Sequence, residues 1–128
     1  MTSEEAYFLA RKEGPSNSTS KIACKDPGFA YMYAMYVDKC PRNYTRKAAC
    51  KLSHSAYWYA LNVDKYPRDD TRLVACEEPY HAYKYAYYID NCFRIDTYLA
   101  TSKDPDCLDK YNEWLFHNII VKKIKPPK

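Results

Sequence analysis

Cysteine and histidine are the side chains of this chain best suited to nucleophilic or metal chemistry, and their spacing favours neither. Cys24, Cys50 and Cys76 recur at one fixed step along the chain, whereas the three histidines share no common position. The sequence contains no CxxC pair, no HExxH motif and no glycine-rich phosphate loop. A pair such as Cys107 with His81 is expected by chance among six cysteines and three histidines. We therefore predict no enzymatic activity, no metal site and no cofactor.

The remaining cysteines indicate the state of the thiols. Cys40 and Cys92 share a second recurring position, whose middle member is Tyr66. A disulfide framework pairs fixed partners, so a position that accepts either Cys or Tyr is filled for size and apolarity. We predict reduced thiols.

Tyrosine is the first residue type whose pattern points to binding. The chain has fifteen tyrosines, and Tyr31, Tyr57 and Tyr83 recur at one position. On a helix this position lies about 100° from the apolar stripe described below. Tyrosine is enriched at interfaces because it offers a large area with few torsions and a polar tip. Two interpretations stay open: the tyrosines wedge between repeats, or they form a binding face, to which the unshared residues Trp58 and Lys84 would contribute.

Arginine is the second such residue type. The recurring arginines are Arg42, Arg68 and Arg94 at one position and Arg46 and Arg72 at another. A ladder at the repeat spacing is an arrangement that can follow a phosphate backbone. However, Asp38, Asp64 and Asp90 each precede a loop arginine by four residues, which is the spacing of an ion pair on one helical face. We favour a neutralised Asp–Arg ladder.

The C-terminal segment is the third candidate. Trp114, Phe116 and Ile120 place apolar groups on several sides of an expected helix, and the basic sequence KKIKPPK follows at 122–128. An amphipathic helix needs only one apolar face. We expect part of the segment to cover the last repeat. Two interpretations of the rest stay open: it completes this cap, or it docks a partner or a second copy of the chain.

An internal repeat must position all of these residues. Three copies of equal length occupy 19–44, 45–70 and 71–96, a partial copy precedes them at 1–18, and a divergent copy follows at 97–121 before the tail. A fixed period of this size is typical of a stacked array whose terminal copies act as caps. The pattern predicts one all-α domain, a solenoid of short helix-turn-helix repeats.

Each copy reads as two helices. Threonine opens every copy, as at Thr19, and is a good N-cap, so we expect a helix of about two turns to begin just after it. Asp26 and Pro27 then start a second helix that runs to about Lys39. Apolar residues at i, i+3, i+4 and i+7 form one stripe along it, consisting of Ala30, Tyr33, Ala34 and Val37 in the first full copy.

The elements T-R-x-A-A-C-K, A-Y-x-Y-A and V-D-K-x-P-R, as they stand between Thr19 and Lys110, resemble a known class of repeat. This class comprises short tandem helical repeats of unassigned function in phage, giant-virus, protist and intracellular-bacterial proteins. The motifs specify a structural unit and no reaction. The resemblance implies a binding surface, and a small array of this kind looks most like a phage-encoded accessory protein.

Charge and hydropathy limit the partners. The net charge is +4 from 20 basic and 16 acidic residues, which indicates a mixed surface rather than a dense positive field. No apolar run approaches the roughly 20 residues that cross a bilayer, and the acidic N-terminus is unlike a signal peptide. We expect a cytoplasmic, non-enzymatic protein-binding module, and the resemblance suggests an inhibitor of a host defence complex. The alternatives are nucleic-acid binding along the Arg/Tyr edge and self-assembly through the C-terminal helix.

Overall fold

The computed structural model describes residues 1–120. Within this range the chain forms helices joined by short loops. The α-helices are α1 (Ser3–Glu13), α2 (Asn17–Ala23), α3 (Pro27–Tyr33), α4 (Asn43–Ala49), α5 (Ser53–Tyr59), α6 (Asp69–Ala75), α7 (Pro79–Tyr85), α8 (Ile95–Thr101) and α9 (Pro105–Leu115). Four of them continue without a break into a π-helical turn, namely η1 (Ala34–Asp38), η2 (Ala60–Asp64), η3 (Ala86–Asp90) and η4 (Phe116–Ile120).

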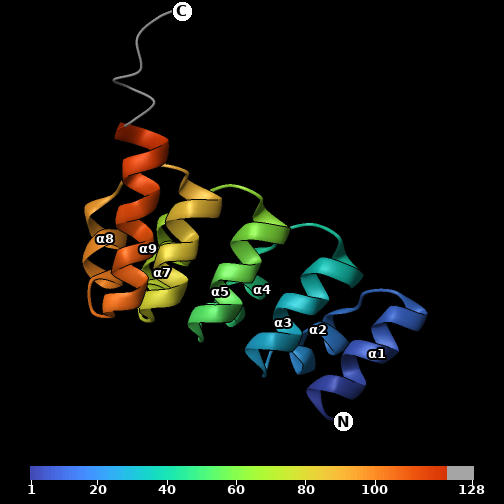
Figure 1. Ribbon diagram of the computed structural model, residues 1–128. Helices are drawn as coiled ribbons and strands as arrows, with labels where there is room; N and C mark the ends of the chain where they lie inside the picture. The colour runs from blue at the N-terminus through green and yellow to red at the C-terminus, as the bar shows by residue number, and fades with distance from the viewer. Residues whose placement is uncertain (121–128) are drawn as a thin grey trace, which may run out of the picture.

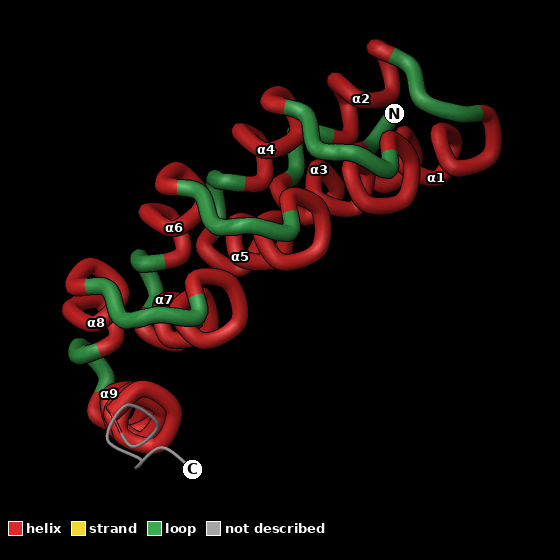
Figure 2. The backbone as a smooth tube through the Cα atoms, turned by 90° about the horizontal axis from the view of Figure 1, so that it is seen from above, coloured by secondary structure: helices red, strands yellow, loops and turns green. Residues whose placement is uncertain are grey.

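The helices stack in two rows, as expected for an all-α repeat solenoid (Figure 1). The short helices α2, α4, α6 and α8 form one row, and α1, α3, α5, α7 and α9 form the other (Figure 2). Each helix of the second row before α9 packs against the next one in its row and against the short helix that follows it in the chain, and α9 packs against α7 and α8. The predicted fold class is therefore confirmed, and α1 takes the place of the second helix of a copy. None of the described helices is both long and apolar enough to cross a membrane.

Small and aromatic side chains fill the space between the rows. Ala30, Tyr33 and Ala34 of the predicted stripe are fully buried, and Val37 packs against this core from a partly buried position. Alanine lets neighbouring helices approach closely. The second helix of this copy, α3 with η1, spans 27–38, which confirms the predicted range to within one residue.

The short helices begin earlier than predicted, and threonine is not their cap. Helix α4 starts at Asn43, with Arg42 as the extended N-cap residue, so Thr45 is the third residue of the helix and is fully buried. The hydroxyl of Tyr59 accepts a hydrogen bond from the Arg42 N–H at 3.0 Å and lies 2.7 Å from the Thr45 hydroxyl. Threonine is therefore the partner of a buried tyrosine rather than a helix cap.

We call this arrangement the tyrosine clamp. It recurs four times, joining Tyr33 to Thr19, Tyr59 to Thr45, Tyr85 to Thr71 and Tyr111 to Thr97, with oxygen–oxygen distances of 2.8, 2.7, 2.7 and 2.9 Å. In each case the tyrosine also meets the backbone of the N-cap residue. A buried phenol needs a partner for its hydroxyl, and a helix N-terminus has unpaired N–H groups, so each group satisfies the other.

The second helix of each copy ends in a tight reversal. Lys39, Lys65 and Asn91 follow the π-helical turns with φ of 58°, 62° and 51°. The Lys65 N–H closes the turn by donating to the Ala60 carbonyl at 2.9 Å. Left-handed backbone is costly for a residue with a Cβ atom. The reversal directs the preceding aspartate back towards the short helix of its own copy.

Candidate functional site

The three recurring tyrosines wedge between neighbouring second helices. Tyr57 is 1% exposed within a core cluster, and burial raises its pKa to about 12. Tyr31 is half-buried and accepts a hydrogen bond from the Asn62 amide at 3.0 Å. Tyr83 packs beside the core formed by Tyr111 and Trp114. Their placement matches the packing interpretation.

A different set of aromatic side chains reaches the surface next to them. Trp58, Tyr80 and Tyr88 are 40%, 48% and 57% exposed. The Lys84 ammonium lies 5.0 Å from the Tyr80 ring centroid, 5.2 Å from that of Tyr57 and 5.5 Å from that of Trp58. A cation among three ring faces is held by cation–π attraction. These contacts fix Lys84 between α5 and α7.

The aromatic set continues onto the last helix. Tyr87 lies beside Tyr83, Tyr88 and Trp114, with centroid distances of 5.9, 4.7 and 5.7 Å. A groove of about 380 Å³ lies next to Tyr83 and Tyr87, and residues of α9 such as Lys110 line its opposite wall. We call the surface formed by Trp58, Tyr80, Lys84, Tyr87 and Tyr88, with Trp114 at its edge, the aromatic face.

The structure brings together some of the residues predicted for a site. Trp58, Tyr83, Lys84 and Trp114 belong to or adjoin the aromatic face, although Trp114 is only 5% exposed. Tyr31 lies in an earlier copy. Phe116 is 55% exposed at the start of η4. The Ile120 side chain and the basic segment 122–128 lie outside the described residues.

Three residues of the aromatic face, Tyr80, Tyr87 and Tyr88, were not among the residues predicted for a site. Tyr80 and Tyr87 occupy positions that hold His54 and Leu61 one copy earlier. Trp58 and Lys84 were selected because the copies do not share them. Tyr80 and Tyr87 meet the same criterion and could have been selected in the same way.

Every recurring arginine is paired with a carboxylate, but two of the three expected pairings are wrong. The Arg46 guanidinium binds Asp64, with Nε 3.0 Å from Oδ2, and both side chains are at most 7% exposed. Arg72 binds Asp90 in the same way, with an Nε–Oδ2 distance of 2.9 Å. Asp64 and Asp90 therefore bind the arginine of the short helix of their own copy and not the loop arginine that follows them. The expected pair of Asp38 with Arg42 does form, at 3.4 Å.

The loop arginines of the later copies bind a nearer aspartate. Arg68 Nε lies 3.0 Å from Asp70, and Arg94 Nη2 lies 3.1 Å from Asp96. The hydrogen bonds that Arg68 donates to Asp70 raise the pKa of Arg68 and lower the pKa of Asp70. The arginine edge is therefore neutralised, as predicted, by the expected carboxylate at Arg42 and by other carboxylates at Arg68 and Arg94.

The thiols and imidazoles form no constellation with an evident reaction. All six cysteines are free, which agrees with the predicted reduced state. Desolvation raises the pKa of Cys24, Cys50, Cys76 and Cys107 to about 11. Such thiols are poor nucleophiles at neutral pH. His81 Nδ1 lies 3.1 Å from the Ser53 hydroxyl, and desolvation lowers the pKa of His81.

Comparisons with known proteins add no family. No protein-family model matches this chain, and no match was found among curated proteins or solved structures. The resemblance to phage and giant-virus repeats therefore stays a prediction.

Proposed function

We propose that this protein is a non-enzymatic protein-binding module whose partner docks on the aromatic face. The observation that carries the proposal is the continuous exposed set of Trp58, Tyr80, Tyr87 and Tyr88 across two neighbouring helices, with Lys84 fixed among the rings. Trp and Tyr dominate the binding energy of protein interfaces because they bury a large area at a small cost in side-chain entropy.

The proposal is tested by affinity capture from a lysate of the host cell, in which the wild-type chain is compared with a triple variant. Trp58→Ala, Tyr80→Ala and Tyr87→Ala together remove the centre of the aromatic face and leave the tyrosine clamps intact. Each centre-of-interface aromatic residue typically contributes about 2 kcal/mol or more, or about 30-fold in affinity, so capture of a specific partner should be lost. The melting curve by circular dichroism reports whether the fold is retained.

A matched control removes exposed apolar surface elsewhere. Tyr66 and Leu73 are 50% and 74% exposed, and neither belongs to the aromatic face. Tyr66→Ala with Leu73→Ala should retain the partner. Equal capture by the triple variant and by this control would refute the proposal.

The two alternatives give different results with the same proteins. The carboxylate partners of the recurring arginines weigh against nucleic-acid binding, which would appear as oligonucleotide affinity that falls steeply with salt. Self-assembly through the C-terminal helix would appear in light scattering as a dimer that the triple variant retains. The first result would identify nucleic acid as the partner, and the second would identify another copy of this chain.

A further inference from the structure

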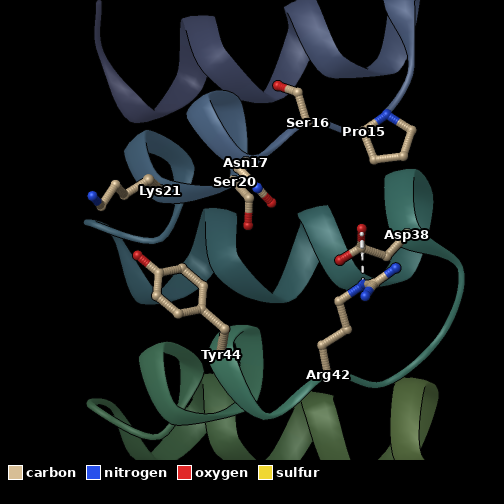
Figure 3. Close-up of a pocket in the computed structure, with 8 residues that line it drawn as sticks. All are labelled: Pro15, Ser16, Asn17, Ser20, Lys21, Asp38, Arg42 and Tyr44. Atoms are coloured by element: carbon tan, nitrogen blue, oxygen red, sulfur yellow. Dashed lines mark ion pairs between the residues drawn. The ribbon is translucent and has the colours of Figure 1, made fainter.

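The first full copy contains a pocket at the place where the second and third copies hold a buried arginine. The pocket has a volume of about 620 Å³, and Asn17, Ser20, Lys21, Asp38, Arg42 and Tyr44 are among its lining residues (Figure 3). The pocket at the corresponding place in the next copy, which Arg46 lines, measures about 410 Å³.

The second copy shows how this place binds a guanidinium. Arg46 donates from Nε and Nη2 to the Asp64 carboxylate, and from Nη1 to the Asn43 side-chain oxygen at 2.7 Å. Its guanidinium carbon also lies 5.5 Å from the ring centroid of Tyr59. A carboxylate, a neutral acceptor and a ring face together satisfy the planar cation.

The first copy keeps all three of these groups and lacks only the arginine. Asp38, Asn17 and Tyr33 stand one full repeat before Asp64, Asn43 and Tyr59, whereas Ser20 holds the position of Arg46. The tyrosine clamp of the first copy has the same dimensions as that of the second, with the hydroxyl of Tyr33 3.0 Å from the N-cap N–H. The framework of the guanidinium site is therefore preserved around an empty position.

The Asp38 carboxylate is only partly satisfied. Its side chain is 4% exposed, and Oδ2 has no hydrogen-bond partner among the residues that the structure describes. Oδ1 meets the Arg42 Nε at 3.4 Å, and Arg42 itself is 58% exposed. Burial raises the pKa of Asp38 against the opposing influence of Arg42. A buried carboxylate oxygen without a donor is costly, so the site favours a hydrogen-bonding cation.

Neither neighbouring cation fills the position. Arg42 approaches Asp38 from the solvent side because Tyr44 replaces the aspartate that binds the loop arginine in later copies. Lys21 extends away from Asp38, which faces Asn17 across the pocket (Figure 3). The Asp38 carboxylate therefore has no cation on the side that faces Asn17 among the residues that the structure describes.

We propose that this pocket binds an alkylguanidinium group, such as the arginine side chain of a partner, in the position that Arg46 occupies in the second copy. The Asp38 carboxylate would accept two hydrogen bonds from the guanidinium, Asn17 would accept a third, and Tyr33 would offer its ring. The pocket uses no residue of the aromatic face, so the proposal is independent of the function proposed above.

Nuclear magnetic resonance titration of the full ¹⁵N-labelled chain tests the proposal. The probes are acetyl-Gly-Arg-Gly-amide and methylguanidinium chloride, and the citrulline peptide serves as the neutral isostere. We expect saturable shifts of the Asn17 and Ser20 amide signals with the arginine peptide. The citrulline peptide should bind at least about tenfold more weakly, because it lacks the positive charge and carries a carbonyl oxygen in place of one of the nitrogen groups that would donate to Asp38. A peptide that binds more tightly than methylguanidinium would identify a protein arginine as the ligand, and the reverse order a small guanidinium compound.

Two variants fix the location of the site. Ser20→Arg should fill the pocket from within, abolish binding and raise the urea midpoint of unfolding. Asp38→Asn should abolish binding with the fold retained. Ser18→Arg adds the same charge to an exposed position of the same helix and should leave binding unchanged. The proposal is overturned by an absence of saturable shifts, by equal affinity for the citrulline peptide, or by undiminished binding to the Ser20→Arg variant.

Discussion

The buried Arg46–Asp64 pair allows a quantitative test of the ion-pair geometry. In the Asp64→Ala variant the Arg46 guanidinium, whose side chain is 7% exposed, would keep only the neutral acceptor Asn43. Removal of one partner from a buried pair costs about 3–5 kcal/mol because the other charge is left uncompensated. For a chain of 128 residues the entropy of unfolding is roughly 0.27 kcal/mol per kelvin, so Tm should fall by about 11–18 °C.

The same substitution in the first copy provides the internal control. Asp38 has no buried arginine partner, and its contact is with Arg42, which is 58% exposed. Because Arg42 is exposed and Asp38 Oδ2 has no donor among the described residues, Asp38→Ala should cost less than about 1 kcal/mol or even raise the stability. In the third copy, Asp90→Ala leaves Arg72 with a second carboxylate, Asp69, at 2.7 Å. The loss of stability of this variant should lie between those of Asp64→Ala and Asp38→Ala.

Urea unfolding followed by circular dichroism measures all three variants. A shift of the midpoint at constant slope reports stability alone. The expected order of loss is Asp64→Ala, then Asp90→Ala, then Asp38→Ala. Equal losses for Asp64→Ala and Asp38→Ala would show that burial of the arginine does not decide the energy of the pair.

Three further changes test other features of the repeat. Tyr59→Phe removes the hydroxyl of a tyrosine clamp and should cost about 1–3 kcal/mol, because an N–H and a carbonyl of the helix N-terminus lose their partner. Burial raises the pKa of Asp38, so the folded chain holds a proton there more tightly than the unfolded chain. The contribution of Asp38 to stability should therefore be lost as pH rises from about 4 through the raised pKa, and Asp38→Asn should remove this slope from urea midpoints. Lys65→Gly relieves the left-handed backbone at φ 62° and should stabilise the chain by about 1 kcal/mol.

Each of these changes has a matched comparison. The Tyr88 side chain is 57% exposed, so Tyr88→Phe should leave the melting temperature unchanged. Lys47→Gly places glycine inside α4 and should cost about 1 kcal/mol, the opposite sign to Lys65→Gly. If Tyr59→Phe and the exposed tyrosine variant had the same melting temperature, the tyrosine clamp would contribute nothing to stability. An identical pH profile for Asp38→Asn and the wild-type chain would mean that Asp38 titrates as it does in the unfolded chain.

The helices could be predicted from the sequence because the residue patterns that specify them are local and recur in the copies. The stripe of Ala30, Tyr33 and Ala34 and the Asp26–Pro27 start specify the second helix of the copy without any tertiary information. The role of threonine could not be predicted from a local pattern of this kind. A threonine before a helix former predicts a cap, but tertiary contact with the tyrosine of the second helix decides its role.

The arginine partners were mispredicted because spacing along a continuous helix was used across a reversal. A continuous helix holds a carboxylate against an arginine four residues later, but η2 ends at Asp64 and Lys65 turns the chain back. Asp38 and Arg42 pair across such a reversal only in the copy that has no buried arginine to bind the aspartate. The repeat itself contained a better signal. The fourth copy replaces the buried arginine with Tyr98 and the buried aspartate with Phe116, so both members of the pair change together.

The aromatic face could be predicted only in part for a related reason. Its residues differ from copy to copy, so the period that located the core gives no information about them. Exposure of Tyr80 and Tyr88, and burial of Tyr57, depend on which neighbouring helix covers each side chain.

The tyrosine clamp also determines where one copy ends and the next begins. When the chain is divided before each N-cap residue, at 16–41, 42–67, 68–93 and 94–119, every clamp and every buried Arg–Asp pair falls within a single segment. Contacts between segments are made mainly by alanine and aromatic side chains. Insertion or deletion of one such segment would therefore leave each of these buried polar groups with its own partner. The length of the array can therefore change by whole segments, and the outer surface would grow or shrink with no change in the core.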